Sequence, residues 1–261
     1  MALRFCVLGS SSAGNATWVA SDTTAILVDA GFSLRTLEER LALIGESAGR
    51  LSAVVVSHEH SDHIAGIPRL QRRHGVQVFA NEGTREGAMQ SPEFAEVRWT
   101  LFHTGHPFEV GDLVITPFAV PHDAYDPVGF LISHDGTTIG IATDLGTSTA
   151  LICARLQACR ALVLEANHDE RMLRDSRRPW ALKQRILSRQ GHLSNRAAAA
   201  LLLEVAGPHL TDVFLAHLSQ ECNHPDFALQ TIEEELRRAG RLHVRLRPTY
   251  ADRPAELWPC A

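Results

Sequence analysis

The amino-acid sequence predicts an α/β fold, an αββα sandwich in which two sheets lie between outer layers of helices. Short apolar strands joined by turns dominate the first part of the chain, and after residue 145 helices alternate with apolar strands. The chain has 261 residues, of which 45% are hydrophobic and 21% charged, and no repeat or linker interrupts it. We therefore expect residues 1–261 to form a single domain.

Strands and turns account for most of the first half. The first expected strands are Arg4–Leu8, Thr17–Ala20 and Ala25–Val28. The stretch Gly9–Asn15 should form the turn between the first two, because it is rich in glycine and serine. A helix is expected over Leu34–Leu43, with Ser33 as its N-cap and Gly45 after its end. Later strands are expected at Ala53–Val56, Val76–Phe79, Leu113–Ala119, Gly129–Ser133 and Thr138–Ala142, the last two joined by an Asp-Gly turn.

Helices predominate in the second half. They are expected at Thr147–Leu156, Pro179–Arg189, Asn195–Val205 and Phe227–Ala239, and strands at Ala161–Leu164 and Val213–Ala216. Strands joined by hairpins in the first half and strands separated by helices in the second together favour the sandwich.

Charge and cysteine content limit the classes of function. The net charge is -5, so any contact with nucleic acid would need a local basic patch. The chain has 5 cysteines at irregular spacing, namely Cys6, Cys153, Cys159, Cys222 and Cys260. This pattern argues against disulfides and a cysteine zinc site, and it favours free thiols in a reducing compartment. Without a signal peptide or an apolar run of membrane-spanning length, we expect a cytoplasmic protein with no membrane contact.

One motif carries strong chemical information. The segment VVVSHEHSDHIAG (54–66) places three histidines and an aspartate of the HxHxDH pattern directly after a buried strand. Alternate residues beyond a strand end can point the same way, so His58 and His60 can bind one ion. Asp62 and His63 lie one turn further on and can reach a second ion. Imidazole and carboxylate groups suit Zn²⁺ and Mn²⁺, and the alternative is a solvated polar loop.

Other polar residues follow apolar strands in the same way. Asp29 ends AILVDAG, His122 ends ITPFAVPH, Asp144 ends IGIATD and His217 ends VFLAH. Each alone could be a turn or cap residue. Strand ends of one sheet converge on one rim, where sites form in α/β folds, so together these residues predict a shared metal site. We expect Gly9–Asn15 to make a tight turn beneath it.

The order of these residues resembles the metallo-β-lactamase-fold hydrolases. The segments LGSSSAGN, LVDAG, SHEHSDH, VPHDA, TDLG, EANHDERML, PWALKQRILSRQGHLSN and AHLSQECN resemble more narrowly the YycJ/WalJ-like subgroup. The resemblance implies a metal-dependent phosphodiesterase, a 5′-to-3′ DNA exonuclease whose nucleophile is a hydroxide bridging two ions. The alternative is a hydrolase of a small substrate, namely a cyclic phosphodiester, lactone or thioester. One departure is Cys222, where the subgroup usually has asparagine.

The resemblance also implies a role for each site residue. Two divalent ions, zinc or manganese, would be held by His58, His60 and His122, by Asp62, His63 and His217, and by Asp144 as a bridge. Asp62 would also take part in catalysis. Asp29 would lie behind the ligands and accept a hydrogen bond from a ligand imidazole.

Cleavage of a phosphodiester also needs an acid for the leaving oxygen. The candidates are His168 and His192, and Glu165 or Asp169 could orient them. We favour His192, because Ser194 can cap a following helix whose N-terminus attracts a phosphate. The ribonuclease Z branch of the superfamily has a similar arrangement. The alternative is that His192 only closes the turn.

A basic strip leads into His192. Residues 170–196 contain eight basic and two acidic residues, a local charge of +6. Arginines could follow a DNA backbone and an aromatic side chain could stack a base. The expected substrate contacts are Arg177, Arg178, Trp180, Ser194 and Asn195. The alternative is a solvated helical surface with Trp180 in the core.

Overall fold

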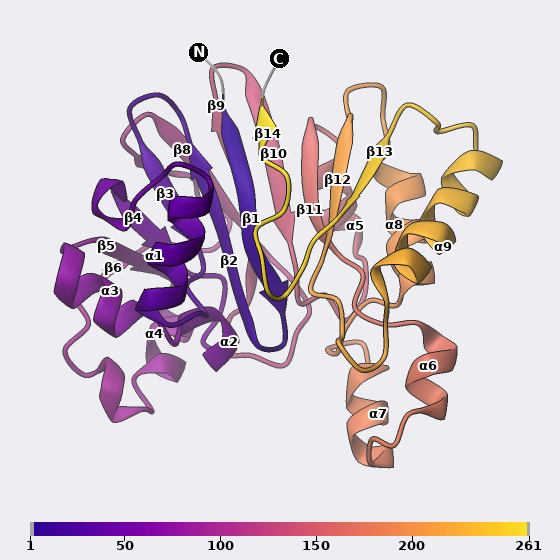
Figure 1. The fold of residues 1–261 in the computed structure, drawn as a ribbon, viewed down its shortest axis with the longest axis horizontal. Helices are drawn as coiled ribbons and strands as arrows, with labels where there is room; N and C mark the ends of the chain where they lie inside the picture. The colour runs from indigo at the N-terminus through magenta and orange to yellow at the C-terminus, as the bar shows by residue number, and fades with distance from the viewer. Residues whose placement is uncertain (1–2, 260–261) are drawn as a thin grey trace.

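The computed structural model describes residues 3–259 and places two seven-stranded sheets face to face between layers of helices (Figure 1). Apolar side chains of α1 (Leu34–Leu43) and α3 (Ile67–His74) pack on the outer side of the first sheet. Those of α5 (Ala150–Leu156), α8 (Asn195–Val205) and α9 (Pro225–Arg238) pack on the outer side of the second. The predicted αββα sandwich is confirmed.

The first sheet is antiparallel on one side and parallel on the other. Its strand order is β14 (Trp258–Pro259), β1 (Arg4–Ser11), β2 (Gly14–Ala20), β3 (Ala25–Val28), β4 (Ala53–Val55), β5 (Gln77–Ala80) and β6 (Trp99–Leu101). From β14 to β3 neighbouring strands are antiparallel, and from β3 to β6 they are parallel. Shorter helical elements connect them: η1 (Ala48–Arg50), α2 (Ser61–Ile64), α4 (Glu82–Ala88) and η2 (Pro92–Phe94).

The second sheet repeats this mixture. Its strand order is β13 (Arg245–Pro248), β12 (Asp212–Ala216), β11 (Ala161–Glu165), β10 (Thr137–Ala142), β9 (Val128–His134), β8 (Leu113–Ala119) and β7 (Phe108–Val110). Strands β10 to β13 are parallel, so their carboxyl ends meet at one edge. Two short helices, α6 (Glu170–Asp175) and α7 (Trp180–Ile186), project beyond this edge (Figure 1).

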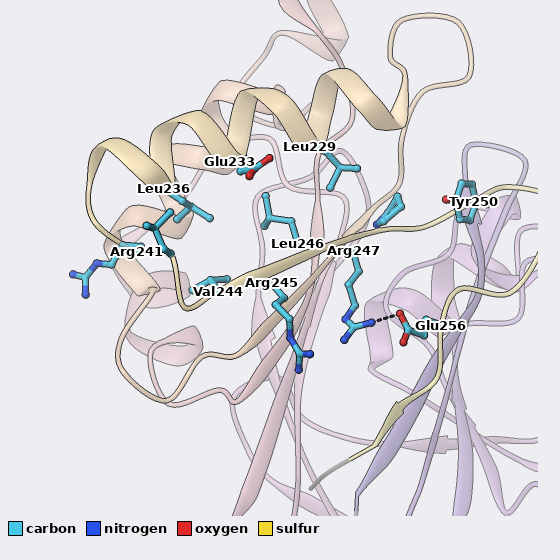
Figure 2. Close-up of a pocket in the computed structure, with 12 residues that line it drawn as sticks. Leu229, Glu233, Leu236, Arg241, Val244, Arg245, Leu246, Arg247, Tyr250 and Glu256 are labelled. Atoms are coloured by element: carbon cyan, nitrogen blue, oxygen red, sulfur yellow. Dashed lines mark hydrogen bonds and ion pairs between the residues drawn. The ribbon is translucent and has the colours of Figure 1, made fainter.

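The inner faces of the two sheets share one apolar core. The rings of Phe5 and Phe214, one from each sheet, lie 4.9 Å apart. A polar contact also joins the layers, because Trp258 donates to the buried carboxylate of Asp212 over 3.0 Å. Arg247 of β13 donates to the same carboxylate over 2.8 Å and also pairs with Glu256 (Figure 2).

Local capping signals located two helices correctly. Helices α1 and α8 have the predicted bounds, and Ser33 and Ser194 accept from backbone N–H groups in their first turns. Other boundaries differ from the prediction. Helix α5 begins later, because Thr149 caps it, α7 ends at Ile186, and α9 begins at Pro225 after the cap His224.

The prediction for Gly9–Asn15 was wrong in extent. Strands β1 and β2 continue through most of this stretch, with Ser10 paired to Asn15, and only residues 12 and 13 form the turn. Several short elements were not predicted, namely α2, α3, α4, α6, β6, β7, β13 and β14. Apart from α3, they span seven residues or fewer, so they display little periodicity in the sequence.

Two further expectations concern membrane-spanning helices and free thiols. No helix within residues 3–259 combines the length and the apolar character needed to cross a bilayer. Cys6, Cys153, Cys159 and Cys222 are buried free thiols, and Cys260 lies outside the described residues.

A groove of about 810 Å³ lies between α9 and the edge strand β13. Leu229 and Leu246 line its apolar side, and Arg241 and Arg245 lie along the strand and its approach (Figure 2). No predicted ligand or catalytic residue lines this groove. We therefore place the chemistry at the carboxyl ends of the strands instead.

Candidate metal centre

The predicted ligands come together where strands of both sheets end. In the first sheet, His58 and Asp29 follow β4 and β3, which are parallel neighbours. In the second sheet, Asp144 and His217 follow β10 and β12, on either side of β11. Parallel strands deliver the residues beyond their carboxyl ends to one edge, so residues far apart in the sequence share a site.

Ligand-type atoms within 4.8 Å of one another form adjoining groups. One group is His58, His60 and His122; a second is Asp62, His63 and His217; a third, formed by His58, His63 and Asp144, connects them. A fourth group contains Asp144, Glu165, His192 and His217. Asp144 lies 3.3 Å from His63 and 3.4 Å from His217. The structure thus brings together the residues that the resemblance pairs around two ions.

Three residues of this site have left-handed backbones. Asp29, Asp144 and His217 have φ values of 61°, 59° and 53°. This region is unfavourable for residues other than glycine, although aspartate tolerates it better than most. Such conformations persist only where the surroundings impose them and are typical of functional sites. Here the three residues follow the ends of β3, β10 and β12, and their side chains contact one another or other residues of the site.

Asp29 fixes one imidazole. Its Oδ2 accepts from Nδ1 of His63 over 2.8 Å, and both carboxylate oxygens also accept from Ser57 over 2.8 Å. Because Nδ1 carries this proton, Nε2 of His63 presents a lone pair to the site unless the ring is protonated. Neither Asp29 nor Asp144 caps a helix.

Glu165 fixes two further histidines. This side chain is fully buried at the end of β11, and its Oε1 lies 2.8 Å from Nδ1 of both His192 and His217. Its Oε2 accepts from the backbone N–H groups of Leu145 and Leu193, each over 2.9 Å. One carboxylate therefore orients both rings so that their Nε2 atoms lie away from it. Asp169 instead caps α6.

Three supporting residues had no predicted role. Ser10 accepts from the backbone N–H of His217 over 2.8 Å, and Asn15 lies 3.2 Å from Asp62 and 3.1 Å from His63. Asn167 donates to the carbonyl of His217 over 2.8 Å. The glycine- and serine-rich stretch was the only signal in the sequence for the first two, as a turn expected beneath the site.

Burial and nearby carboxylates shift the pKa values of the buried site histidines in opposite directions. Burial lowers the pKa of His58, where neighbouring histidines add to the effect, and also that of His122. Burial would lower the pKa of His217 as well, but Asp144, Asp62 and Glu165 raise it to about 10. Asp29, Asp144 and Asp62 likewise raise the pKa of His63 well above its ordinary value. His58 and His122 thus favour the neutral imidazole, whereas His63 and His217 would release protons on taking up a cation.

Buried ring nitrogens without a hydrogen-bond partner test whether these residues fit a metal ion. Nε2 of His58 and Nε2 of His217 are buried and make no hydrogen bond within the described residues. Buried polar groups without partners are rare, and each requires an explanation. Both atoms belong to the ligand-type groups above. The donor set therefore fits divalent cations that accept nitrogen and oxygen ligands.

His168, the other candidate acid, has a different environment. Its side chain is 1% exposed, and neither ring nitrogen makes a hydrogen bond. Burial lowers its pKa to about 4. Its backbone pairs with Ser194, and its carbonyl accepts from the backbone of Asn195. Within the described residues, His168 belongs to none of the ligand-type groups.

The basic strip is exposed in part. The predicted alternative of Trp180 as a core residue is wrong, because its side chain is 65% exposed at the start of α7. Arg177 is exposed, whereas Lys183 is buried and donates to two backbone carbonyls. Within residues 3–259, the exposed Arg174, Arg177, Arg189 and Arg196 make no ion pair.

Two of the predicted substrate contacts have structural partners. Ser194 caps α8 and donates to Glu170 over 3.0 Å. Asn195 is 1% exposed, and its amide pairs with that of Asn223 over 3.0 and 2.8 Å. We therefore do not include them among the substrate contacts proposed below. Cys222 is buried in a small apolar cluster with Leu173 and Ile186.

A cavity of about 390 Å³ adjoins His192. Arg178 and Arg185 line it, and acidic side chains hold both: Arg178 lies 3.0 Å from Glu221, and Arg185 pairs with Asp123. A substrate phosphate could replace these carboxylates as the partner of either guanidinium.

Comparisons with known proteins agree with this geometry. The family model described as a β-lactamase superfamily domain matches residues 24–217. The chain is 34% identical over 242 residues to exodeoxyribonuclease YycJ of Bacillus anthracis, covering 92% of this chain and 91% of that protein. It is 34% identical over 239 residues to exodeoxyribonuclease WalJ of Streptococcus pneumoniae, covering 90% and 89%.

A solved structure shows the same fold. The metallo-β-lactamase-fold protein YhfI from Bacillus subtilis matches with a TM-score of 0.76 at 17% identity, and 100% of each chain is covered. At this identity the similarity establishes the fold and no more. Together with the family match and the two curated relatives, it agrees with the sandwich described above. The chain therefore belongs to the β-lactamase superfamily, among the metallo-β-lactamase-fold hydrolases that include YycJ and WalJ.

Proposed function

We propose that the protein is a dinuclear metal phosphodiesterase that degrades DNA from an end, in the 5′-to-3′ direction. The observation that carries this proposal is the pair of adjoining histidine and aspartate groups connected through Asp144. Relatives that match about nine-tenths of the chain are named exodeoxyribonucleases, which supports DNA as the substrate. The direction of digestion rests on the resemblance of the sequence motifs.

In this proposal each group holds one zinc or manganese ion. The ligands are His58, His60 and His122 for one ion, Asp62, His63 and His217 for the other, and Asp144 for both. Such ions, when bound, supply Lewis acidity that activates a water and neutralises charge on the attacked phosphate. Asp29 and Glu165 keep the Nε2 atoms of His63 and His217 directed into the site. Asp62 also contributes to catalysis by keeping negative charge beside these rings.

His192 serves as the acid for the leaving oxygen. Its Nδ1 lies 2.8 Å from Glu165, and its ring lines the cavity next to the ligands. A ring oriented by a carboxylate can donate a proton from the opposite nitrogen. His168 is the weaker candidate, because its ring is buried without polar contacts.

A DNA strand would contact the exposed part of the basic strip. Arg177 and Arg178 offer charge to phosphates, and Trp180 offers a ring to a base. We further propose that residues 1–261 act as one domain, because both sheets contribute to the shared core. The buried free thiols support a reducing, cytoplasmic location.

The first test combines DNA cleavage with charge reversal. Purified protein with Mn²⁺ or Zn²⁺ should shorten end-labelled DNA, with products that identify the direction, and EDTA should stop the reaction. The double variant Arg177→Glu/Arg178→Glu should degrade DNA at least about tenfold more slowly at low salt, because it repels the phosphates. Hydrolysis of bis-p-nitrophenyl phosphate should change much less.

A matched control reverses two charges elsewhere. Arg72 and Arg73 of α3 pair with Glu96 and Glu38 on the helix surface, over 3.1 and 3.3 Å. The double variant Arg72→Glu/Arg73→Glu should keep most of the DNA activity. Wild-type protein that hydrolyses small esters but leaves DNA intact would favour the alternative, a small-substrate hydrolase.

The role of His192 gives a second prediction. His192→Ala should lower DNA hydrolysis about a hundredfold, because the leaving oxygen of DNA needs a proton. The p-nitrophenolate leaving group needs none, so bis-p-nitrophenyl phosphate should be affected far less. The measurement is kcat on both substrates, with metal content determined for each preparation. His209→Ala, at an exposed histidine, is the control. Equal losses on both substrates would contradict proton donation.

A further inference from the structure

One exposed aromatic residue, close in sequence to the predicted ligand His122, has no part in the site described so far. Tyr125 lies in the loop between β8 and β9, three residues after the predicted ligand His122. Its side chain is 59% exposed.

The loop around Tyr125 is fixed by several contacts. The carboxylate of Glu59, which stands between His58 and His60, accepts from the backbone N–H of Tyr125 over 3.0 Å. The carbonyl of Asp126 accepts from Asn81 over 2.7 Å, and its carboxylate accepts from Thr104 over 3.0 Å. The backbone that carries the ring is therefore held by hydrogen bonds, one of them to the metal motif.

Helix α4 allows the loop to approach closely. A Cβ atom added to Gly83 would lie 2.7 Å from Cβ of Asp126. A Cβ atom added to Gly87 would lie 2.5 Å from Cγ of Glu59 and 3.0 Å from Cδ2 of Tyr125. Only glycine fits at these positions without a shift, so α4 supports both Glu59 and the tyrosine ring.

The position of this ring complements the basic strip. Figure 1 shows α4 and α7 on opposite sides of α2, the short helix that carries Asp62 and His63. The strip on α7 would contact the strand on one side of the cleaved bond. Tyr125, whose ring lies against Gly87 of α4, would contact it on the other side.

We propose that Tyr125 is a stacking platform for an unpaired base of the DNA substrate, and that Glu59 is the positioning residue that holds it. This proposal rests on the proposed function. An exposed aromatic ring on a loop that is hydrogen-bonded to the metal motif can recognise a nucleobase by stacking, without preference for its sequence.

Steady-state kinetics on a single-stranded oligonucleotide test the platform. Tyr125→Ala should raise KM about tenfold with a smaller change in kcat, because stacking contributes to binding. Tyr125→Phe should restore the wild-type KM, since it keeps the ring. Gly87→Ala should also raise KM by displacing Glu59 and the ring. Phe227→Ala removes an aromatic side chain that is 49% exposed on α9 and serves as the control.

A spectroscopic readout separates stacking from a general effect on the loop. 2-Aminopurine placed at successive positions of the oligonucleotide should be quenched at one position on binding to wild-type protein and Tyr125→Phe, but not to Tyr125→Ala. Unchanged KM and quenching in Tyr125→Ala, with DNA cleavage intact, would overturn the platform alone. Tyr125-dependent quenching without cleavage by wild-type protein would support the platform and overturn the proposed nuclease.

Discussion

Asp144→Asn is expected to reduce DNA hydrolysis by on the order of a thousandfold and to lower the metal content of the purified protein. Asp144 touches His63 and His217 and lies 3.7 Å from His122, so its charge serves both groups of ligands. Asparagine tolerates the same left-handed backbone, so the change removes charge while keeping the local conformation. The loss combines weaker metal binding with weaker stabilisation of the transition state.

The chain contains a matched control for this variant. Asp135 also has a left-handed backbone, with φ of 45°, but it lies in the hairpin turn between β9 and β10. Asp135→Asn should therefore keep full activity and metal content. Activity of Asp144→Asn within about tenfold of the wild type, at equal metal content, would exclude a bridging role.

Glu165→Ala is expected to lower the free energy of unfolding by about 3 kcal/mol and DNA hydrolysis by at least about tenfold. The substitution leaves the buried N–H groups of Leu145 and Leu193 without an acceptor. It also releases the rings of His192 and His217 from their orientation. Urea denaturation in the presence of EDTA measures the change in stability without a contribution from bound metal.

An exposed glutamate provides the comparison. Glu96 has a side chain that is 83% exposed and pairs with Arg72 over 3.1 Å, so Glu96→Ala should change stability by less than about 1 kcal/mol. If Glu165→Ala were no more destabilising than Glu96→Ala, the buried carboxylate would not organise the site. Glu165→Gln should give an intermediate loss, since its single oxygen cannot accept all four bonds.

Features with local causes were predictable from the sequence. Ser33 and Ser194 are N-cap residues and so mark the first turns of α1 and α8. The apolar strand before His58 indicates where the metal motif begins. The predicted ligands could be chosen together because polar residues after several buried strands share an edge in an α/β fold. The same rule identified Asp29 and Asp144 as candidate site residues.

Features that depend on distant contacts were not predictable. Ser10 meets His217 across more than 200 residues of sequence, and Asn167 meets the carbonyl of the same histidine. The burial of Asn195 depends on Asn223 from the loop before α9. No periodicity or capping signal reports such pairs. The prediction of Asn195 as a substrate contact lacked this information.

The order of the ligands along the chain has a consequence for biosynthesis. His58 is made early, whereas His217 follows the last long buried strand of the second sheet, 159 residues later. A growing chain that lacks β12 cannot assemble the second group of ligands, whatever part of the first sheet has already folded. Prematurely ended chains would therefore carry most of the predicted ligands without an assembled centre. Hydrolytic activity therefore requires that both sheets have formed.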